Sequence, residues 1–246
     1  MRGRHPLCAG ILAGTLTFLT SLPLGLAQPV AQPVAPWEVA LRLAAPSDAA
    51  WRRQAMALLS VALRVRTAVE AAEGVTPAEV SPGSLFDTPF LVWSGRDAIT
   101  LDADARAALG DFLGHGGLLL VDGDPTRDRA FLQSVEEVLE TVLPTVDSPA
   151  PALRPVADDD VLLRTFYLLP GGGVRSPGDL RAARAGTRIA VVESRADLLG
   201  ALATGAAPER ERATRFLVNT VMYALCLDYK SDQVHAPFLM RRRAGP

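Results

Sequence analysis

The stretch "DADARAALGDFLGHGGLLLVDG", residues 102–123, joins a helix to a buried strand and decides the fold. Its first half combines an aspartate that can cap a helix with alanines and leucines, and glycines follow, so it predicts one helix. The run "LLLVDG" at 118–123 then predicts a buried strand. A similar run, "TPFLVWSG" at 88–95, precedes the helix. Buried strands that alternate with helices are typical of a parallel sheet.

The alternation continues on both sides of this unit. Further strands are expected at 39–44, 162–169 and 186–194, and further helices at 47–73, 127–143 and 208–229. In the first helix, one apolar stripe is predicted from the helical spacing of Trp51, Ala55, Leu58, Leu59, Ala62 and Val65. The chain therefore predicts an α/β domain at 38–229, with a mostly parallel sheet and helices on both faces.

Residues 1–27 have the pattern of a signal peptide. Arg2 and Arg4 precede an apolar run, and Gly25 and Ala27 suit cleavage before Gln28. The alternative is an uncleaved membrane anchor, because about 20 apolar residues can span a bilayer. Both interpretations predict export in a bacterium, to the periplasm or beyond, with inner-membrane anchoring if the segment stays attached. Residues 28–37 are rich in proline and predict an extended linker.

Charge and cysteine content narrow the class of protein. The chain has 25 basic and 27 acidic residues, and without residues 1–27 its net charge is about −4, which gives no support to nucleic-acid binding. Only Cys226 then remains, so an intramolecular disulfide is excluded. Its position in the apolar run "VMYALCL" predicts a buried structural thiol in preference to a nucleophile.

The last predicted helix is apolar nearly all round from Phe216 to Leu227 and too short to span a membrane, so we expect it to be buried. Asn219, the only asparagine of the chain, needs hydrogen-bond partners there, either in a loop backbone or in a ligand. A polar and basic tail at 230–246 follows. It can pack over the domain, or dock an acidic partner or an anionic membrane surface. The polar residues of this exit are Tyr229, Lys230, Asp232, Gln233 and His235.

The stretch "VNTVMYALCLDYKSDQVHAPFLMRRR" at 218–243 resembles the C-terminal signature of the bacterial family called domain of unknown function 4159 (DUF4159). "LFDTPFLVWSGRDAITL", "LGDFLGHGGLLLVDG", "LLRTFYLL" and "RIAVVESRADLLGA" resemble the same family in the same order, so the resemblance covers about residues 38–243. The family is similar to the class I glutamine amidotransferase-like superfamily, which implies a flavodoxin-like fold. It implies no defined activity. It does imply envelope partners, including membrane proteins with von Willebrand-type domains and AAA+ ATPases. One departure is "SRAD" at 194–197, where members have a Ser-Pro-Asn-Asp-like turn.

Ligands of open α/β sheets bind beyond the carboxyl ends of the strands, so the candidate binding residues lie where strands end. They are Ser94, Gly95, Arg96, Asp122, Gly123, Glu193 and Ser194, to which Asn219 and the five polar residues after the last helix are added.

The candidate chemistry centres on "VDGDP" at 121–125. The resemblance implies a cysteine nucleophile after this strand, but Asp122, Gly123 and Asp124 follow it and no Cys, Ser or Thr appears before Thr126. A covalent thiol mechanism therefore has no residue to use. Asp122 or Asp124 near His115 could instead serve a hydrolase, or join Asp128 in chelating a cation.

The simpler interpretation is that Asp124 and Asp128 cap the next helix and His115 ends the previous one, with no metal and no cofactor. "PGGGVR" at 170–175 predicts a flexible turn in preference to a phosphate loop, and "ADDDV" at 157–161 predicts a solvated turn. The sequence as a whole favours an exported, non-catalytic binding or assembly subunit of the cell envelope. A hydrolase that uses Asp122 or Asp124 is the alternative.

Overall fold

The computed structural model describes residues 39–45, 49–82, 84–146, 152–169 and 177–243, and for residues 227–243 only the backbone. These residues belong to one compact unit of the chain, 33–246. The expected signal peptide, the linker and the turn at 170–175 lie outside the described residues.

A seven-stranded sheet, in the order β2-β1-β3-β4-β7-β6-β5, forms the middle layer. Its strands are β1 (Arg42–Ala44), β2 (Thr76–Pro77), β3 (Phe90–Trp93), β4 (Leu118–Asp122), β5 (Arg154–Pro155), β6 (Leu180–Ala185) and β7 (Arg188–Ser194). The strands from β2 to β7 in that order are mutually parallel, whereas β6 and β5 add an antiparallel edge. Taken alone, the parallel strands follow the order 2-1-3-4-5, which is compatible with a flavodoxin-like arrangement.

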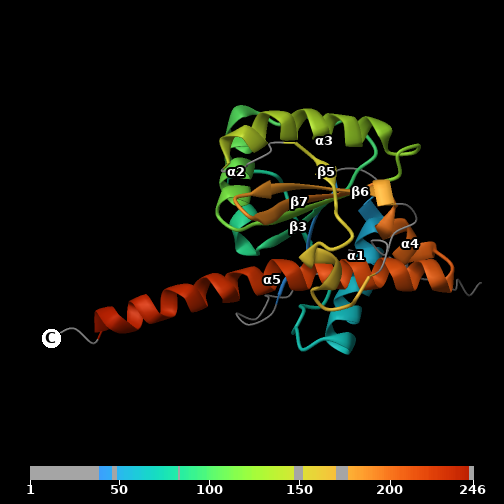
Figure 1. Cartoon of the computed structure of the whole chain (residues 1–246). Helices are drawn as coiled ribbons and strands as arrows, with labels where there is room; N and C mark the ends of the chain where they lie inside the picture. The colour runs from blue at the N-terminus through green and yellow to red at the C-terminus, as the bar shows by residue number, and fades with distance from the viewer. Residues whose placement is uncertain (1–38, 46–48, 83, 147–151, 170–176, 244–246) are drawn as a thin grey trace, which may run out of the picture. The chain divides into compact units, whose positions relative to one another are not determined.

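Helices cover both faces of the sheet, as the sequence predicts (Figure 1). They are α1 (Ala49–Arg66), α2 (Ala103–Gly114), α3 (Arg129–Val142), α4 (Leu198–Thr204) and α5 (Ala207–Arg243). Short 3₁₀ turns lie at η1 (Leu85–Asp87), η2 (Leu143–Thr145), η3 (Val161–Arg164) and η5 (Pro177–Asp179). One core cluster joins α1, α4 and α5 to the sheet, and a second joins α2 and α3 to its other face. The predicted mostly parallel sheet with two covered faces is confirmed.

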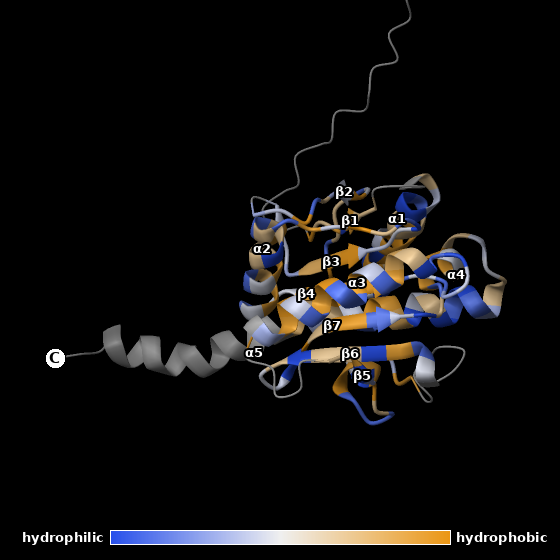
Figure 2. Cartoon of the chain, turned by 90° about the horizontal axis from the view of Figure 1, so that it is seen from above, coloured by the Kyte–Doolittle hydropathy of each residue, from blue (hydrophilic) through white to orange (hydrophobic). Residues whose placement is uncertain are grey.

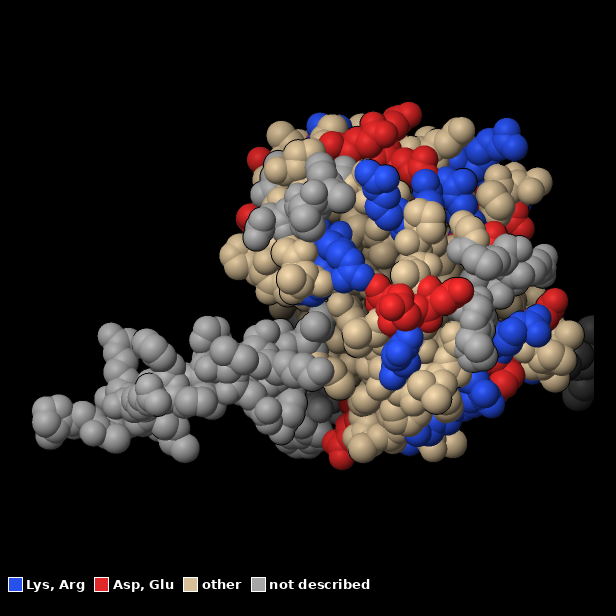
Figure 3. Space-filling view, viewed as in Figure 1, with Lys and Arg blue, Asp and Glu red and all other residues tan. Residues whose placement is uncertain are grey.

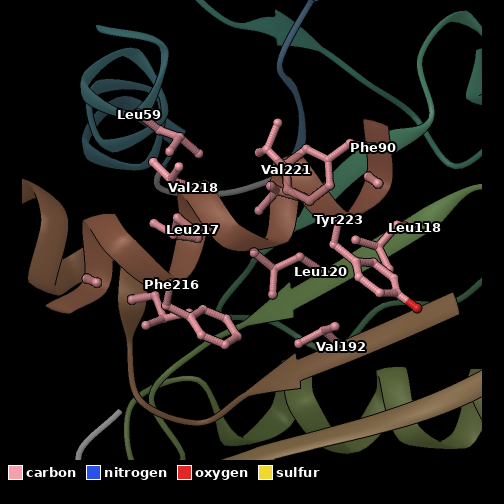
Figure 4. Close-up of a cluster of buried hydrophobic side chains, with 14 of the residues drawn as sticks. Leu59, Phe90, Leu118, Leu120, Val192, Phe216, Leu217, Val218, Val221 and Tyr223 are labelled. Atoms are coloured by element: carbon pink, nitrogen blue, oxygen red, sulfur yellow. The ribbon is translucent and has the colours of Figure 1, made fainter. Parts of the chain in front are cut away.

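The central strands are mostly hydrophobic, because both of their faces are buried (Figure 2). On the α5 side, Phe216, Leu217 and Val221 pack over the inner strands (Figure 4). Tyr223 lies in the same cluster, and its hydroxyl accepts a hydrogen bond from the Ile189 backbone N–H at 2.8 Å. This bond satisfies a donor at the start of β7, next to the register shift in β6.

Two sequence expectations about helices were wrong. The buried face of α1 consists of Arg52, Ala55, Met56, Leu59, Ser60 and Leu63. Leu58 and Val65, placed in the buried stripe by the sequence, are exposed. The polar members of the true face were hidden from a hydrophobic pattern because they bond inside the protein, as Ser60 does to the Ala72 carbonyl at 2.6 Å. Cys226 is exposed and not buried, because the buried face of α5 ends at Ala224.

The segment 162–169 is not the strand that its apolar pattern predicted. It begins in η3 and turns back on itself, and Leu162, Leu163 and Leu169 point into the core. Asn219 supplies the reason, since its side chain bonds the backbone of this segment in place of a neighbouring strand. In the turn before it, Asp160 is not solvated. It forms an ion pair with Arg184 and accepts from the Leu162 N–H at 3.0 Å. The last helix also continues to Arg243, past the predicted end at Tyr229.

Candidate functional site

The three predicted strand ends lie side by side at one edge of the sheet. Trp93 of β3 pairs with Val121 of β4, and Asp122 pairs with Ser194 of β7. The residues that follow β3, β4 and β7 therefore share the edge at which α/β proteins bind ligands. We call this edge, with the loops that follow the three strands, the strand-end edge.

Arg52 of α1 lies at the crevice where β1 and β3 end, because its partner Ser94 also donates its N–H to the Ala44 carbonyl of β1 at 3.1 Å. Its side chain is about 1% exposed, and its Nε donates to the Ser94 Oγ at 2.9 Å. Its Nη2 donates to the Gly95 carbonyl at 3.1 Å and faces the Asp128 carboxylate at 3.4 Å. In the 2-1-3-4-5 strand order this crevice is the switch point where ligands bind. Here it holds a guanidinium group from the protein itself.

Asp128 is the acceptor at the centre of this network. Its carboxylate is fully buried and receives the Asp124 N–H at 2.9 Å as well as the guanidinium groups of Arg52 and Arg127. Arg127 also forms an ion pair with Asp197 at 3.0 Å, and thereby joins the loop after β4 to the loop after β7. The Trp51 ring lies against both guanidinium groups, with centroid distances of 4.4 Å to Arg52 and 5.3 Å to Arg127.

Asp122, the main catalytic candidate, caps α4. Its two carboxylate oxygens accept hydrogen bonds from the Leu198 and Leu199 N–H groups, both at 2.9 Å. Burial raises the pKa of Asp122 to about 6, the Leu199 N–H opposes this increase, and the Asp197 charge adds to it. The side chain of Asp122 is fully buried, as is that of Ser194, which bonds to it. A proton acceptor with no exposed surface cannot reach a substrate.

Glu193 also forms ion pairs within the protein. It is 2% exposed, accepts from the Arg195 Nε at 2.9 Å and contacts Arg181. Both arginines also contact Glu136 of α3, Arg195 at 2.5 Å. The network ties β6 and β7 to α3 and buries Glu193 beside two arginines.

A polar groove of about 420 Å³ lies beside α4 at the strand-end edge. Asp124, Asp179, Asp197 and Glu209 contribute carboxylates to its wall, and Arg195 contributes the opposite charge. Asp124 accepts from the Thr126 N–H at 2.7 Å and from the Arg127 N–H at 3.0 Å, and these donors lower its pKa. Asp124 thus caps the turn that precedes α3. Asp128 faces inward and makes no cap bond of its own.

His115 does not join the aspartates. It follows α2 and precedes β4, whereas Asp122 ends β4, so the two lie at opposite ends of a five-residue strand. A strand of that length separates them by roughly 15–20 Å. His115 bonds the Asp111 carbonyl at 2.7 Å through Nδ1, as a residue that ends a helix does. The structure therefore contradicts the combination of His115 with Asp122, Asp124 or Asp128 in one site. Within the described ranges, no three His, Cys, Asp or Glu side chains are grouped to hold a metal ion.

The remaining candidates divide into internal and external positions. Gly123 donates from its N–H to the Ser194 carbonyl at 3.2 Å, and Gly95 packs on Phe131 so closely that a Cβ there would lie 2.9 Å from the ring. Arg96 is exposed at the rim. Asn219 lies in the core, away from this edge, and is discussed below. The side chains of Tyr229, Lys230, Asp232, Gln233 and His235 lie outside the described residues.

Sequence reasoning missed Arg52, Asp128 as its partner, Arg127 and Asp197. One signal was present in the sequence. Arg52 lies at helical spacing from Ala55, Met56 and Leu59, on the buried face of α1, where an unpaired arginine would be costly. A second signal was the position of Asp197 in the turn after β7, because aspartate is common at helix caps. In the structure Asp197 adopts a left-handed φ of 49°, a conformation that aspartate tolerates.

These features define a class: a mixed α/β domain whose strand-end edge is occupied by its own polar side chains. The family model "Domain of unknown function (DUF4159)" matches residues 40–225, which is most of the chain. The chain belongs to this family. No curated protein matches it.

Proposed function

We propose that this chain is an exported, non-catalytic binding or assembly subunit of the bacterial cell envelope, with a flavodoxin-like domain of the glutamine amidotransferase-like type. The N-terminal pattern of residues 1–27 supports export, and the 2-1-3-4-5 order of the parallel strands supports the fold. Among the described residues, no helix is long and apolar enough to cross a membrane. The partner is proposed to be an envelope protein, which by resemblance includes membrane proteins with von Willebrand-type domains.

One observation carries the non-catalytic interpretation. At the place where related folds bind substrates, the buried polar groups bond to each other: Arg52 to Ser94 and Asp128, and Asp122 to the first N–H groups of α4. Catalysis needs a nucleophile or a base within reach of a substrate. Buried groups that already bond inside the protein hold the loops in place. Rigid loops of this kind suit a scaffold that presents a binding surface.

A hydrolase remains the second candidate because of one feature, the pKa of Asp122 near 6. A carboxylate with a raised pKa is a common sign of a general acid or base. Against this stand the full burial of Asp122 and the position of His115 at the other end of β4.

Export is tested by fractionation. We expect the mature protein in the osmotic-shock fraction, with its N-terminus at Gln28 or within a few residues of it. Recovery of a chain that begins at Met1 from the membrane fraction would contradict cleavage and support the anchored form.

Catalysis is tested by a hydrolase substrate screen on the wild type beside Asp122→Asn and Asp124→Asn, with Asp158→Asn, an exposed carboxylate far from this edge in sequence, as the matched control. We expect no turnover in any of them, and the same envelope partners to co-purify with all four. Turnover that is present in the wild type and the control but lost in either variant would establish the hydrolase instead, since a missing general base typically lowers rates by about 10²–10⁴-fold.

A further inference from the structure

The segment 161–168 exposes apolar side chains although it is held firmly in place. Phe166 and Leu168 are 42% and 79% exposed, and their neighbours Leu163 and Leu169 are buried. Mobile loops usually carry small polar residues at such positions. A fixed segment with exposed aromatic and aliphatic side chains indicates a contact surface.

Asn219 fixes the segment from inside the protein. Its Oδ1 accepts from the Tyr167 N–H at 2.7 Å, and its Nδ2 donates to the Leu162 and Tyr167 carbonyls at 3.1 and 2.9 Å. The only asparagine in the chain therefore satisfies three backbone groups of one segment. The loop is ordered before any partner arrives, which lowers the entropy cost of binding.

The exposed residues lie next to the last turn of α1. Phe166 packs edge-to-face on Tyr167 with ring centroids 4.9 Å apart, and the Arg215 guanidinium lies 5.3 Å from the Tyr167 ring. Arg66 bonds Glu211 at 2.8 Å, and its pKa is raised first by Glu211 and further by the nearby Tyr167 hydroxyl. Val65, the neighbour of Arg66, is 78% exposed. We call Phe166 and Leu168, with the arginines beside them, the apolar-basic patch.

Three arginines and the carboxylate of Glu211 lie beside this patch. Arg66 and Arg215 share the single carboxylate of Glu211, and Arg164 is exposed within the segment itself. On the face drawn in Figure 3, basic and acidic side chains are both interspersed with uncharged surface. Asp158 and Asp159 are exposed at the start of the segment and limit the patch on that side.

The chain that precedes the domain leaves it close to the patch. The Val39 N–H donates to the Glu70 carbonyl at 2.8 Å, just after α1 ends at Arg66. Eleven residues separate Val39 from the apolar run that ends at Ala27. Eleven residues span at most about 40 Å, so this side of the domain stays near the membrane for as long as the exported chain is still attached through that run.

We propose that the apolar-basic patch docks on an anionic phospholipid surface, with Phe166 and Leu168 entering the interface and the arginines meeting the headgroups. Apolar side chains inserted at the headgroup boundary, together with basic residues that attract anionic lipid, are the two components of interfacial binding. This inference rests on the proposed export only for its biological setting, because the lipid surface can be tested in isolation.

The test uses the chain from Gln28 to Pro246, which retains both core clusters, since every member of the clusters lies between Leu41 and Leu225. Its co-sedimentation with phosphatidylcholine vesicles is compared with and without phosphatidylglycerol. Binding is expected only with the anionic lipid, and is expected to weaken at high salt. The double variant Phe166→Ser/Leu168→Ser should weaken it by at least about tenfold.

The matched control is Phe86→Ser, because Phe86 is 57% exposed but packs against Phe112 on the α2 side of the sheet. It should bind like the wild type, and all variants should keep the same unfolding midpoint. The C-terminal arginines are present in every variant, so equal binding by the double variant would assign binding to the tail and overturn the proposal. Absence of wild-type binding, or self-association lost in the double variant, would also overturn it. Failure of export in cells would leave the vesicle result unchanged and contradict only the proposed function.

Discussion

Replacing Asp122 by asparagine separates two opposing effects on a buried carboxylate. Burial disfavours the charge of Asp122, whereas the two N–H groups at the start of α4 favour it. The net result is a folded-state pKa of about 6, above the ordinary value of 3.8. The folded protein therefore holds the Asp122 proton more tightly than the unfolded chain does. Stability from this proton is fully present below pH 3.8 and is lost as the pH rises through 6.

The size of the effect follows from the difference in pKa. About two pKa units correspond to about 3 kcal/mol between pH values well below 4 and well above 6. Between pH 7.5 and pH 5 the part gained is about 1 kcal/mol. Asp122→Asn removes the titration and adds a constant cost of roughly 1–3 kcal/mol, because the amide can accept from one of the two N–H groups while its own NH₂ faces the other.

The assay is urea unfolding at several pH values, followed by the fluorescence of Trp51 and Trp93. The quantity of interest is the free energy of unfolding of the wild type minus that of Asp122→Asn, because other carboxylates titrate equally in both proteins. This difference should increase by about 1 kcal/mol from pH 7.5 to pH 5. A difference that decreases over the same range would refute the reasoning, since it would mean that the α4 N–H groups outweigh burial and hold the pKa below its ordinary value.

Three further substitutions test the packing. Arg52→Met should lower the free energy of unfolding by about 3–5 kcal/mol in urea titrations, because Asp128 loses a buried partner, whereas the exposed neighbour Arg53→Met should change it by less than about 0.5 kcal/mol. Asn219→Leu should cost about 3 kcal/mol or more, since three backbone groups lose their partner, and Asn219→Asp should also destabilise the protein, because its second oxygen would face the Leu162 and Tyr167 carbonyls that the amide now donates to; equal midpoints for all three proteins would show that the amide contributes nothing. Gly117→Ala should cost about 1–3 kcal/mol, because its Cβ would lie 2.4 Å from the Phe112 ring, and Gly178→Ala, which has open space, should leave the thermal midpoint unchanged.

The layers of the fold were predictable because buried parallel strands carry a direct signal. The runs ending at Trp93, Asp122 and Ser194 contain four consecutive apolar residues each, at 90–93, 118–121 and 189–192, and such runs place a strand in a covered sheet without further information. The sequence also indicated that these three strand ends would share one edge. The antiparallel β6, which alternates arginine and alanine, gave no comparable pattern, since its hydrophobic content is low.

The contents of the site were not predictable, because they depend on long-range pairing. Arg52 and Asp128 are 76 positions apart, and nothing in either neighbourhood identifies the other as its partner. The same holds for Asp122 and the N–H groups of Leu198 and Leu199. A carboxylate at a strand end looks alike in sequence whether it serves a substrate or caps a helix. Only the placement of the donors decides between the two.

The closed strand-end edge has a consequence for where this domain can act. Arg52, Arg127 and Asp128 tie α1 to the loop after β4, and Asp197 extends the tie to the loop after β7. A ligand that entered the crevice would have to displace the Arg52 guanidinium and leave the Asp128 carboxylate buried with one fewer partner, at a cost of several kcal/mol. The groove beside α4 stays open, and two of its carboxylates, those of Asp124 and Asp197, already have donors. The exposed apolar side chains of the segment that Asn219 holds can be contacted without this cost, because no internal hydrogen bond or ion pair has to break. Recognition by this domain is therefore expected on its outer surface.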